Sequence, residues 1–154
     1  MSTPKEKKKR VEKNNPLDWA VETRDQAVLD MVNEAILHKE VMLAYQPVVL
    51  AREPKKPAFF EGLIRVLDET ERVIPAREFI HHVEDTEAGR QLDCLSLEMG
   101  LQTLLQNPKV TLSINMSARS IGYAEWNHIL KSALNKHPEV AKRLILEVSE
   151  PSAM

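Results

Sequence analysis

The sequence predicts an α/β fold, in which helices cover a sheet or barrel whose strands are mostly parallel. The main observation is that strand-like and helix-like segments alternate after residue 58, which is typical of parallel βαβ units. A second observation is that 43% of the 154 residues are hydrophobic, which suffices for one sizeable core. We therefore expect one domain rather than several.

Charge and cysteine content narrow the function classes. The 21 basic and 23 acidic residues nearly balance, so the totals do not indicate a protein that coats nucleic acid, and we expect no DNA partner. A single cysteine, Cys94, excludes an intramolecular disulfide, and no Cys or His spacing matches a structural zinc site. Because Cys94 lies in an apolar segment, we interpret it as a buried structural thiol rather than a nucleophile.

The sequence predicts neither a membrane span nor a signal peptide. Its longest apolar stretches are far shorter than the roughly 20 residues that cross a bilayer. The charged residues at its start are not followed by an apolar segment. We therefore expect a soluble protein in the cytoplasm.

Residues 1–16 are predicted to form a disordered basic tail, because they are rich in lysine and almost free of apolar side chains. Such a cluster could attach to an acidic membrane or to nucleic acid. No aromatic residues interleave it, however, and a merely solvated tail is the favoured interpretation. The folded domain is then expected over residues 17–154.

Local patterns predict the order of the elements within that domain. Apolar positions at helical spacing indicate a long amphipathic helix over residues 17–40, and β-branched residues then indicate a strand over 41–50. Prolines favour a turn over 52–57. The later elements are predicted as a strand over 58–67, a helix over 75–84, a mostly buried helix over 87–106, a strand over 110–115, a helix over 123–135 and a strand over 144–149.

The strand over 58–67 carries charged residues on a face that should lie near the core. Side chains alternate along a strand, so Glu61, Leu63 and Arg65 share one face with Phe59. The other face is wholly apolar and should pack under helices. Burying a carboxylate and a guanidinium is costly unless they are paired or have a function. Glu61 and Arg65 should therefore form either a structural ion pair or part of a functional site.

Two further polar side chains lie where later strands are predicted to end. Asn115 closes one strand and Glu150 follows the next, and in parallel α/β folds ligands bind at the carboxyl ends of strands. Together with Glu61 they would supply three hard oxygen ligands, suited to Mg²⁺ or Mn²⁺ rather than zinc. Each also has a simpler interpretation, since Asn115 could cap a helix and Glu150 could lie in the first turn of one.

Five short segments, in order and at similar spacing, resemble successive signatures of the EAL domain family. They cover the chain from about residue 40 to its last residue. The segments are Tyr45-Gln46-Pro47-Val48-Val49, Glu61-Gly62-Leu63-Ile64-Arg65, Ile74-Pro75 with Phe79-Ile80, Ser113-Ile114-Asn115-Met116-Ser117 and Leu146-Glu147-Val148-Ser149-Glu150.

The resemblance implies a TIM-like (β/α) barrel, present here as roughly its first half. It implies that the intact domain hydrolyses cyclic di-GMP to linear pGpG with two Mg²⁺ or Mn²⁺ ions, in bacterial second-messenger signalling, and that it forms a homodimer. Paired metal ions can stabilise both the attacking and the leaving oxygen of such a displacement. The matching positions are Glu61, Asn115 and Glu150 for the metal ions, Arg65 for a substrate phosphate, and Gln46 and Leu63 for the nucleotide pocket.

Two departures from the family pattern affect these expectations. Gly62 replaces the alanine of the family's name, and the lost methyl group should loosen the strand modestly. The Asp-Asp-Phe-Gly segment and the later lysine, glutamate and glutamine positions of the family do not appear in the 154 residues. Without these residues we expect no hydrolytic activity from this chain alone. We also expect a fragment of a longer protein, because a TIM barrel takes about 250 residues.

Two alternatives to the enzyme remain at this point. A degenerate EAL-like domain would bind cyclic di-GMP or a protein partner without cleaving anything. An unrelated α/β scaffold protein would bind neither the nucleotide nor a metal ion.

Overall fold

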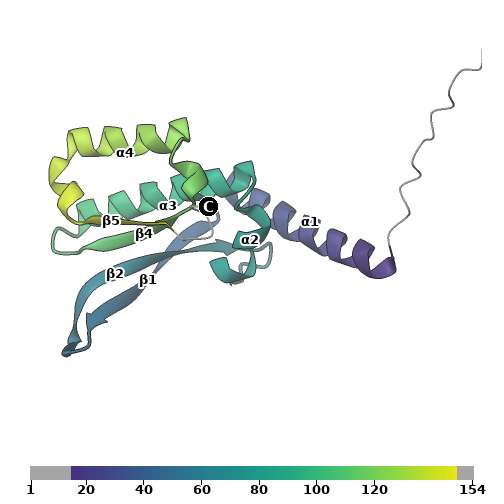
Figure 1. The fold of residues 1–154 in the computed structure, drawn as a ribbon, viewed down its shortest axis with the longest axis horizontal. Coiled ribbons are helices and arrows are strands. Elements are labelled where there is room, and N and C mark those ends of the chain that lie inside the picture. The colour runs from purple at the N-terminus through teal and green to yellow at the C-terminus, as the bar shows by residue number, and fades with distance from the viewer. Residues whose placement is uncertain (1–14, 149–154) are drawn as a thin grey trace, which may run out of the picture.

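One mixed sheet organises the chain, and helices cover one of its faces (Figure 1). The computed structural model describes residues 15–148. The main strands lie in the order β1-β2-β4-β5, and β3 pairs with β2 off this path. The strands are β1 (Val41–Leu50), β2 (Glu53–Leu67), β3 (Val73–Pro75), β4 (Leu112–Met116) and β5 (Leu144–Val148).

The parallel strands β2, β4 and β5 confirm the predicted α/β class. β2 runs parallel to β4, and β4 runs parallel to β5. The long helix α3 (Glu87–Gln106) connects β2 and β3 to β4, and α4 (Ala124–Lys136) connects β4 to β5. Within residues 15–148 the sheet does not close into a barrel.

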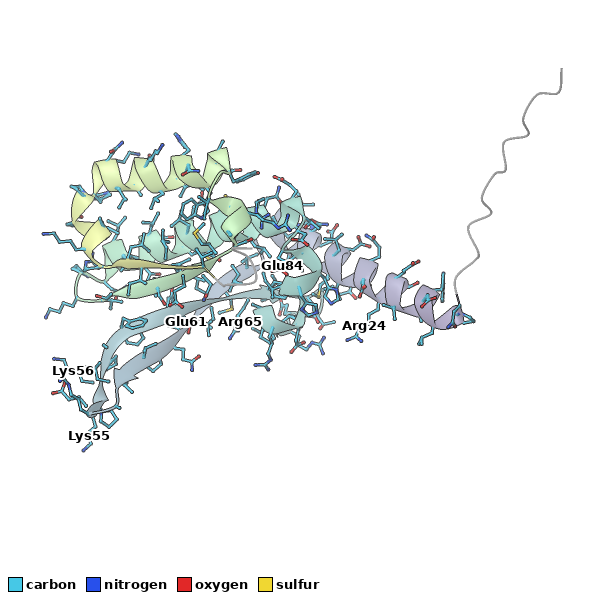
Figure 2. The ribbon with its side chains drawn as sticks, viewed as in Figure 1. Arg24, Lys55, Lys56, Glu61, Arg65 and Glu84 are labelled. Atoms are coloured by element: carbon cyan, nitrogen blue, oxygen red, sulfur yellow. The ribbon has the colours of Figure 1, made fainter. Side chains whose placement is uncertain are left out.

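β1 and β2 form a long antiparallel hairpin, and here the predicted turn over 52–57 is wrong. β2 already begins at Glu53, so both prolines of that segment belong to the strand. A proline lacks the N–H of a ladder bond and is tolerated on a strand with a free edge. This part of β2 pairs only with β1, because β4 first pairs with β2 at Phe60. Figure 2 shows Lys55 and Lys56 at the projecting end of the hairpin.

A short hairpin joins β2 to β3, and the sequence analysis missed it. The Asp68 carboxylate accepts hydrogen bonds from Thr70 N at 2.9 Å and Arg72 N at 3.0 Å, which fold the chain back. A hydrogen bond from the Thr70 hydroxyl at 2.7 Å, together with the two backbone bonds, lowers the pKa of Asp68 to about 2. β3 has only three residues, too few to show an alternating pattern.

The predicted helix over 75–84 is also corrected. The chain forms a 3₁₀ turn over Ala76–Glu78 and then the short helix α2 over Ile80–Val83. Phe79 breaks the helix between them with φ −135° and ψ −20°. Its side chain is completely buried, so burial of the ring in the core accounts for the break.

Helix α1 (Pro16–Leu37) begins and ends at identifiable caps. The Asn15 side chain accepts a hydrogen bond from Leu17 N at 3.0 Å, so Pro16, assigned to the tail above, belongs to the helix. The helix ends three residues earlier than predicted. Lys39 adopts φ 57°, and Glu40 N donates to Ala35 O at 2.8 Å, the bonding pattern of a Schellman cap.

Two hydrophobic clusters hold the helices to the sheet. One joins β4 to α3 and α4, and the other joins α1 and α2 to β2 and the first turns of α3. The apolar face predicted for β2 packs into both, as expected, and α3 is mostly buried, as expected. In residues 15–148 no helix is long and apolar enough to cross a membrane.

At Gly62, where the sequence analysis expected a modestly looser strand, a neighbouring side chain fills the space of the missing methyl group. A Cβ atom at this position would lie 2.9 Å from Ile114 Cδ1, so the isoleucine occupies the space that an alanine methyl group would need. Gly100 on α3 borders the same isoleucine, since a Cβ there would lie 2.6 Å from Cδ1. The missing methyl group is therefore compensated by a neighbouring side chain.

This compensation predicts a coupling between positions 62 and 114. Gly62→Ala should destabilise the chain by about 1–3 kcal/mol through overpacking. Ile114→Val, which removes Cδ1, should cost about 0.5–1.5 kcal/mol alone. Urea unfolding of the double variant should show a loss smaller than the sum by about 0.5 kcal/mol or more. Additive losses would contradict the compensation.

Gly89 permits the close approach of α3 to the end of α2. A Cβ atom at this position would lie 2.5 Å from the backbone oxygen of Val83, which no side-chain movement can relieve. We predict that Gly89→Ala destabilises the fold by about 1–3 kcal/mol in urea unfolding. Gly122→Ala is the control, because nothing lies within 4 Å of a Cβ there. Equal stability of the two variants would refute the steric argument.

Candidate functional site

A cavity of about 340 Å³ opens where β2 and β4 separate. The pairing of these strands ends at Gly62 opposite Ile114, and β2 then pairs with β3 from Arg65 onward. The residues between these two ladders face the gap. The cavity is lined by Glu61, Gly62, Leu63, Ile64, Ala76, Ile80, Glu84, Gly89, Arg90, Leu92, Asp93, Ser96, Asn115, Met116 and Ser117.

Glu61 and Asn115, two of the predicted metal ligands, meet at this cavity. Asn115 Nδ2 donates a hydrogen bond of 2.8 Å to Glu61 Oε1. Glu61 is half-buried and Asn115 is exposed. The pair keeps two more oxygen acceptors, Glu61 Oε2 and Asn115 Oδ1, whose chemistry suits a hard cation such as Mg²⁺.

The third predicted ligand, Glu150, lies outside the described residues. β5 runs beside β4, with Glu147 opposite Asn115 and Val148 opposite Met116, so the described ends of the two strands are neighbours. Within residues 15–148 no three His, Cys, Asp or Glu side chains converge as a metal site would require. Of the three predicted metal ligands, the structure therefore describes two, Glu61 and Asn115.

The residues predicted for the nucleotide lie on or beside this face of the sheet. Gln46 is the direct cross-strand partner of Glu61 in the β1–β2 ladder. Leu63 and Arg65 follow Glu61 at two-residue steps, and Leu63 lines the cavity. Arg65 is half-buried and donates to Ile64 O at 3.0 Å; Figure 2 shows it with Glu61 along β2. Within residues 15–148 Glu61 and Arg65 form no ion pair with each other, so the structural pair considered above is not formed.

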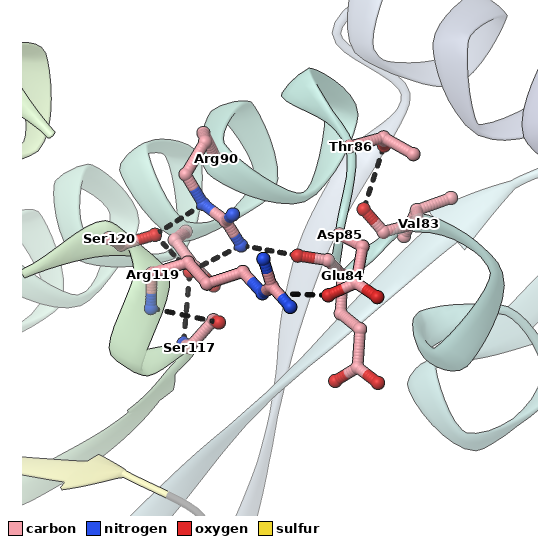
Figure 3. Close-up of polar contacts among 9 residues, drawn as sticks. Val83, Glu84, Asp85, Thr86, Arg90, Ser117, Arg119 and Ser120 are labelled. Atoms are coloured by element: carbon pink, nitrogen blue, oxygen red, sulfur yellow. Dashed lines mark hydrogen bonds and ion pairs between the residues drawn. The ribbon is translucent and has the colours of Figure 1, made fainter. Parts of the chain in front are cut away.

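A buried polar network, which the sequence analysis did not identify, borders the cavity on the helix side (Figure 3). Asp93 on α3 accepts hydrogen bonds from Ser120 Oγ at 2.5 Å and Ser117 N at 3.0 Å. Arg90 donates from Nε to Ser120 Oγ at 2.8 Å and from its terminal nitrogen to Glu84 O at 2.7 Å. The network thus joins α3 to the segment after β4 and to the end of α2.

Burial dominates the electrostatics of this network. Asp93 is only 8% exposed, and desolvation raises its pKa above the usual value. The bonds from Ser120 and Ser117 and the charge of Arg90, 4.0 Å away, act in the opposite direction. The one available sequence signal was a pair of charged residues, Arg90 and Asp93, three positions apart on a helix predicted to be mostly buried.

Cys94 is a buried thiol, as the sequence analysis expected. Burial, with the charges of Glu125 and Asp93, raises its pKa to about 12, so it is a thiol rather than a thiolate near neutral pH. It lies in the hydrophobic cluster under α3 and does not line the cavity.

We predict that Cys94 does not react with a thiol reagent in the folded chain at pH 7–8. With increasing urea the reaction rate should rise in parallel with the unfolding transition that circular dichroism measures. The physical reason is that attack needs an exposed thiolate, and the fold withholds both exposure and charge. Rapid modification of the native chain would contradict this assignment.

Comparison with known proteins supports the resemblance read from the five segments. The family model described as EAL domain matches residues 29–154. No curated protein sequence matches the chain.

Solved structures match the fold as well. The Xanthomonas citri FimX EAL domain in complex with c-diGMP gives a TM-score of 0.70 at 17% identity, with 88% of this chain and 54% of that chain covered. The FimX EAL domain from Pseudomonas aeruginosa bound to c-di-GMP gives 0.66 at 22%, covering 82% and 51%. The PaMucR phosphodiesterase in its c-di-GMP complex gives 0.62 at 26%, covering 83% and 53%. The chain therefore spans about half the length of these structures.

Proposed function

The chain belongs to the EAL domain family, and on this basis we propose that it forms part of a phosphodiesterase domain that hydrolyses cyclic di-GMP to linear pGpG. The observation that carries the proposal is the hydrogen-bonded pair of Glu61 and Asn115 in the lining of the cavity. The family match and the cyclic di-GMP complexes among the similar structures support the same substrate. Bacterial second-messenger signalling in the cytoplasm is the setting that we propose.

The donor atoms of the pair fit a divalent cation. A carboxylate and a side-chain amide are oxygen donors of the kind that Mg²⁺ and Mn²⁺ prefer. We propose that Glu61 and Asn115, with Glu150, hold the metal ions of the intact domain. When bound, such ions lower the pKa of a water molecule and neutralise charge on a phosphate. The Asn115 bond to Glu61 fixes the rotamers of both side chains before a cation arrives.

The remaining residues are proposed to hold the nucleotide. Arg65 offers the forked donors that match a phosphate. Arg65 lies on β2 four residues after Glu61, and therefore on the same face of the strand as Glu61. Gln46 lies opposite Glu61 on β1, and Leu63 follows Glu61 on β2 and lines the cavity, so an amide and an apolar side chain flank Glu61.

The metal assignment is tested by calorimetric titration of the chain with Mn²⁺. Glu61→Gln should weaken Mn²⁺ binding by about tenfold or more, since it removes the charge of a ligand and even residues that only support ligands contribute that much. Glu53→Gln is the matched control, because this exposed glutamate lies at the far end of the hairpin. Equal affinity of the two variants, or no Mn²⁺ binding by the unmodified chain, would count against the site.

The substrate assignment is tested by titration with cyclic di-GMP in the presence of Mn²⁺ and by chromatography of the products. Arg65→Ala should weaken nucleotide binding, while Arg52→Ala at the hairpin tip should not. Binding without pGpG formation in a longer protein that contains this chain would favour the alternative function, a domain that senses cyclic di-GMP without cleaving it. Neither binding nor turnover in that protein would reject both functions.

A further inference from the structure

We propose that Asp93 is a positioning residue for Asn115, and through Asn115 for the cation site. The inference rests on the proposed function, which supplies the role of Asn115. Asp93 itself lies on α3, is more than nine-tenths buried, and touches neither Glu61 nor Asn115 through a hydrogen bond. Its carboxylate instead holds the backbone that follows Asn115.

In the described part of the chain, β4 has no strand partner on its β2 side at Asn115. Pairing with β2 ends at Ile114, so within residues 15–148 Asn115 has a strand partner on one side alone, Glu147 of β5. A strand end with one neighbour is more free to move than one held on both sides. Something other than the β2 ladder must therefore hold the backbone of β4 at Asn115, from which the side chain reaches Glu61.

Asp93 supplies that restraint. Its Oδ2 accepts the backbone N–H of Ser117, two residues after Asn115, at 3.0 Å, and the Ser120 hydroxyl at 2.5 Å. Both donors lie within four residues of each other, so one carboxylate oxygen fixes the turn that ends β4. A bond from a backbone N–H to a charged acceptor is shorter and stronger than one to a neutral acceptor.

Arg90 holds the carboxylate in place from the other side. Its guanidinium bonds Ser120 Oγ and Glu84 O, at 2.8 and 2.7 Å, and lies 4.0 Å from Asp93 Oδ2. Hence the turn after β4 is tied to α3 and to the end of α2 as one unit. Burying a carboxylate is costly, and an apolar side chain at position 93 would cover the core without that cost. A buried carboxylate at position 93 is explained by its role in placing the residues that follow Ile114.

The chain itself allows the test, with the side-chain amide of Asn115 as a direct probe. Its two protons give ¹H–¹⁵N signals whose position reports the bond to Glu61, without any metal ion. Asp93→Ala should move these signals toward those of a solvated amide and weaken Mn²⁺ binding about 10- to 100-fold, the range found for residues that support metal ligands. Asp93→Asn, which keeps an acceptor oxygen, should restore most of both.

Tyr123→Phe is the matched control. It removes the hydrogen bond between Tyr123 and Glu87, which also joins α3 to the segment after β4 but does not reach Ser117. This variant should leave the Asn115 signals and the Mn²⁺ affinity unchanged, whatever its effect on the melting temperature. Should Asp93→Ala fail to fold, Ser120→Ala removes one of the two bonds and should shift the Asn115 signals in the same direction.

The outcomes separate this inference from the proposed function. Unmoved Asn115 signals in Asp93→Ala and Ser120→Ala, with only a lower melting temperature, would overturn the positioning role. Shifted signals in a chain whose unmodified form binds no Mn²⁺ would support the positioning role and reject the cation site instead.

Discussion

The edge of β2 has two partners, and the site depends on the change from one to the other. β2 pairs with β4 up to Gly62 and with β3 from Arg65 onward, so a short interval of backbone faces neither strand. The cavity lies at this interval, and Glu61 and Asn115 lie on its two sides. In a sheet with an unbroken ladder here, side-chain and backbone atoms would fill the gap, and a small ligand could not enter between the strands.

The sequence predicted the parts of this site that follow from local periodicity. Alternation along β2 placed Glu61, Leu63 and Arg65 on one face, because the two-residue period is a property of the strand itself. It also predicted that Asn115 would approach Glu61, since neighbouring parallel strands end at the same edge. It failed at β3, whose pairing with β2 is too short to leave a pattern. It failed again at Asp93, since nothing local shows that its partners lie 24 and 27 residues away.

Gly62 shows why a departure from a family pattern must be judged with its neighbours. Alone, the loss of a methyl group from a buried strand suggests a small void. In the fold, Ile114 from β4 extends into the space between Gly62 on β2 and Gly100 on α3. The two glycines and the isoleucine form one steric unit drawn from three elements. The volume is therefore conserved across positions that lie far apart in the sequence, which is how cores tolerate substitution.

The separation of β2 from β4 also allows residues from the two faces of the sheet to line one cavity. Asp93 and Arg90 belong to the helix-covered face, whereas Glu61 and Asn115 project from strands whose opposite, apolar side meets that helix. Across a continuous sheet these groups would be separated by backbone and unable to border one space. Because the ladder is interrupted, all four line the same cavity. A polar network buried under a helix can then fix the end of β4, and with it a side chain on the other face, over a path of only a few residues. Such a layout places the supporting contacts on rigid elements and leaves the opposite face accessible to a ligand.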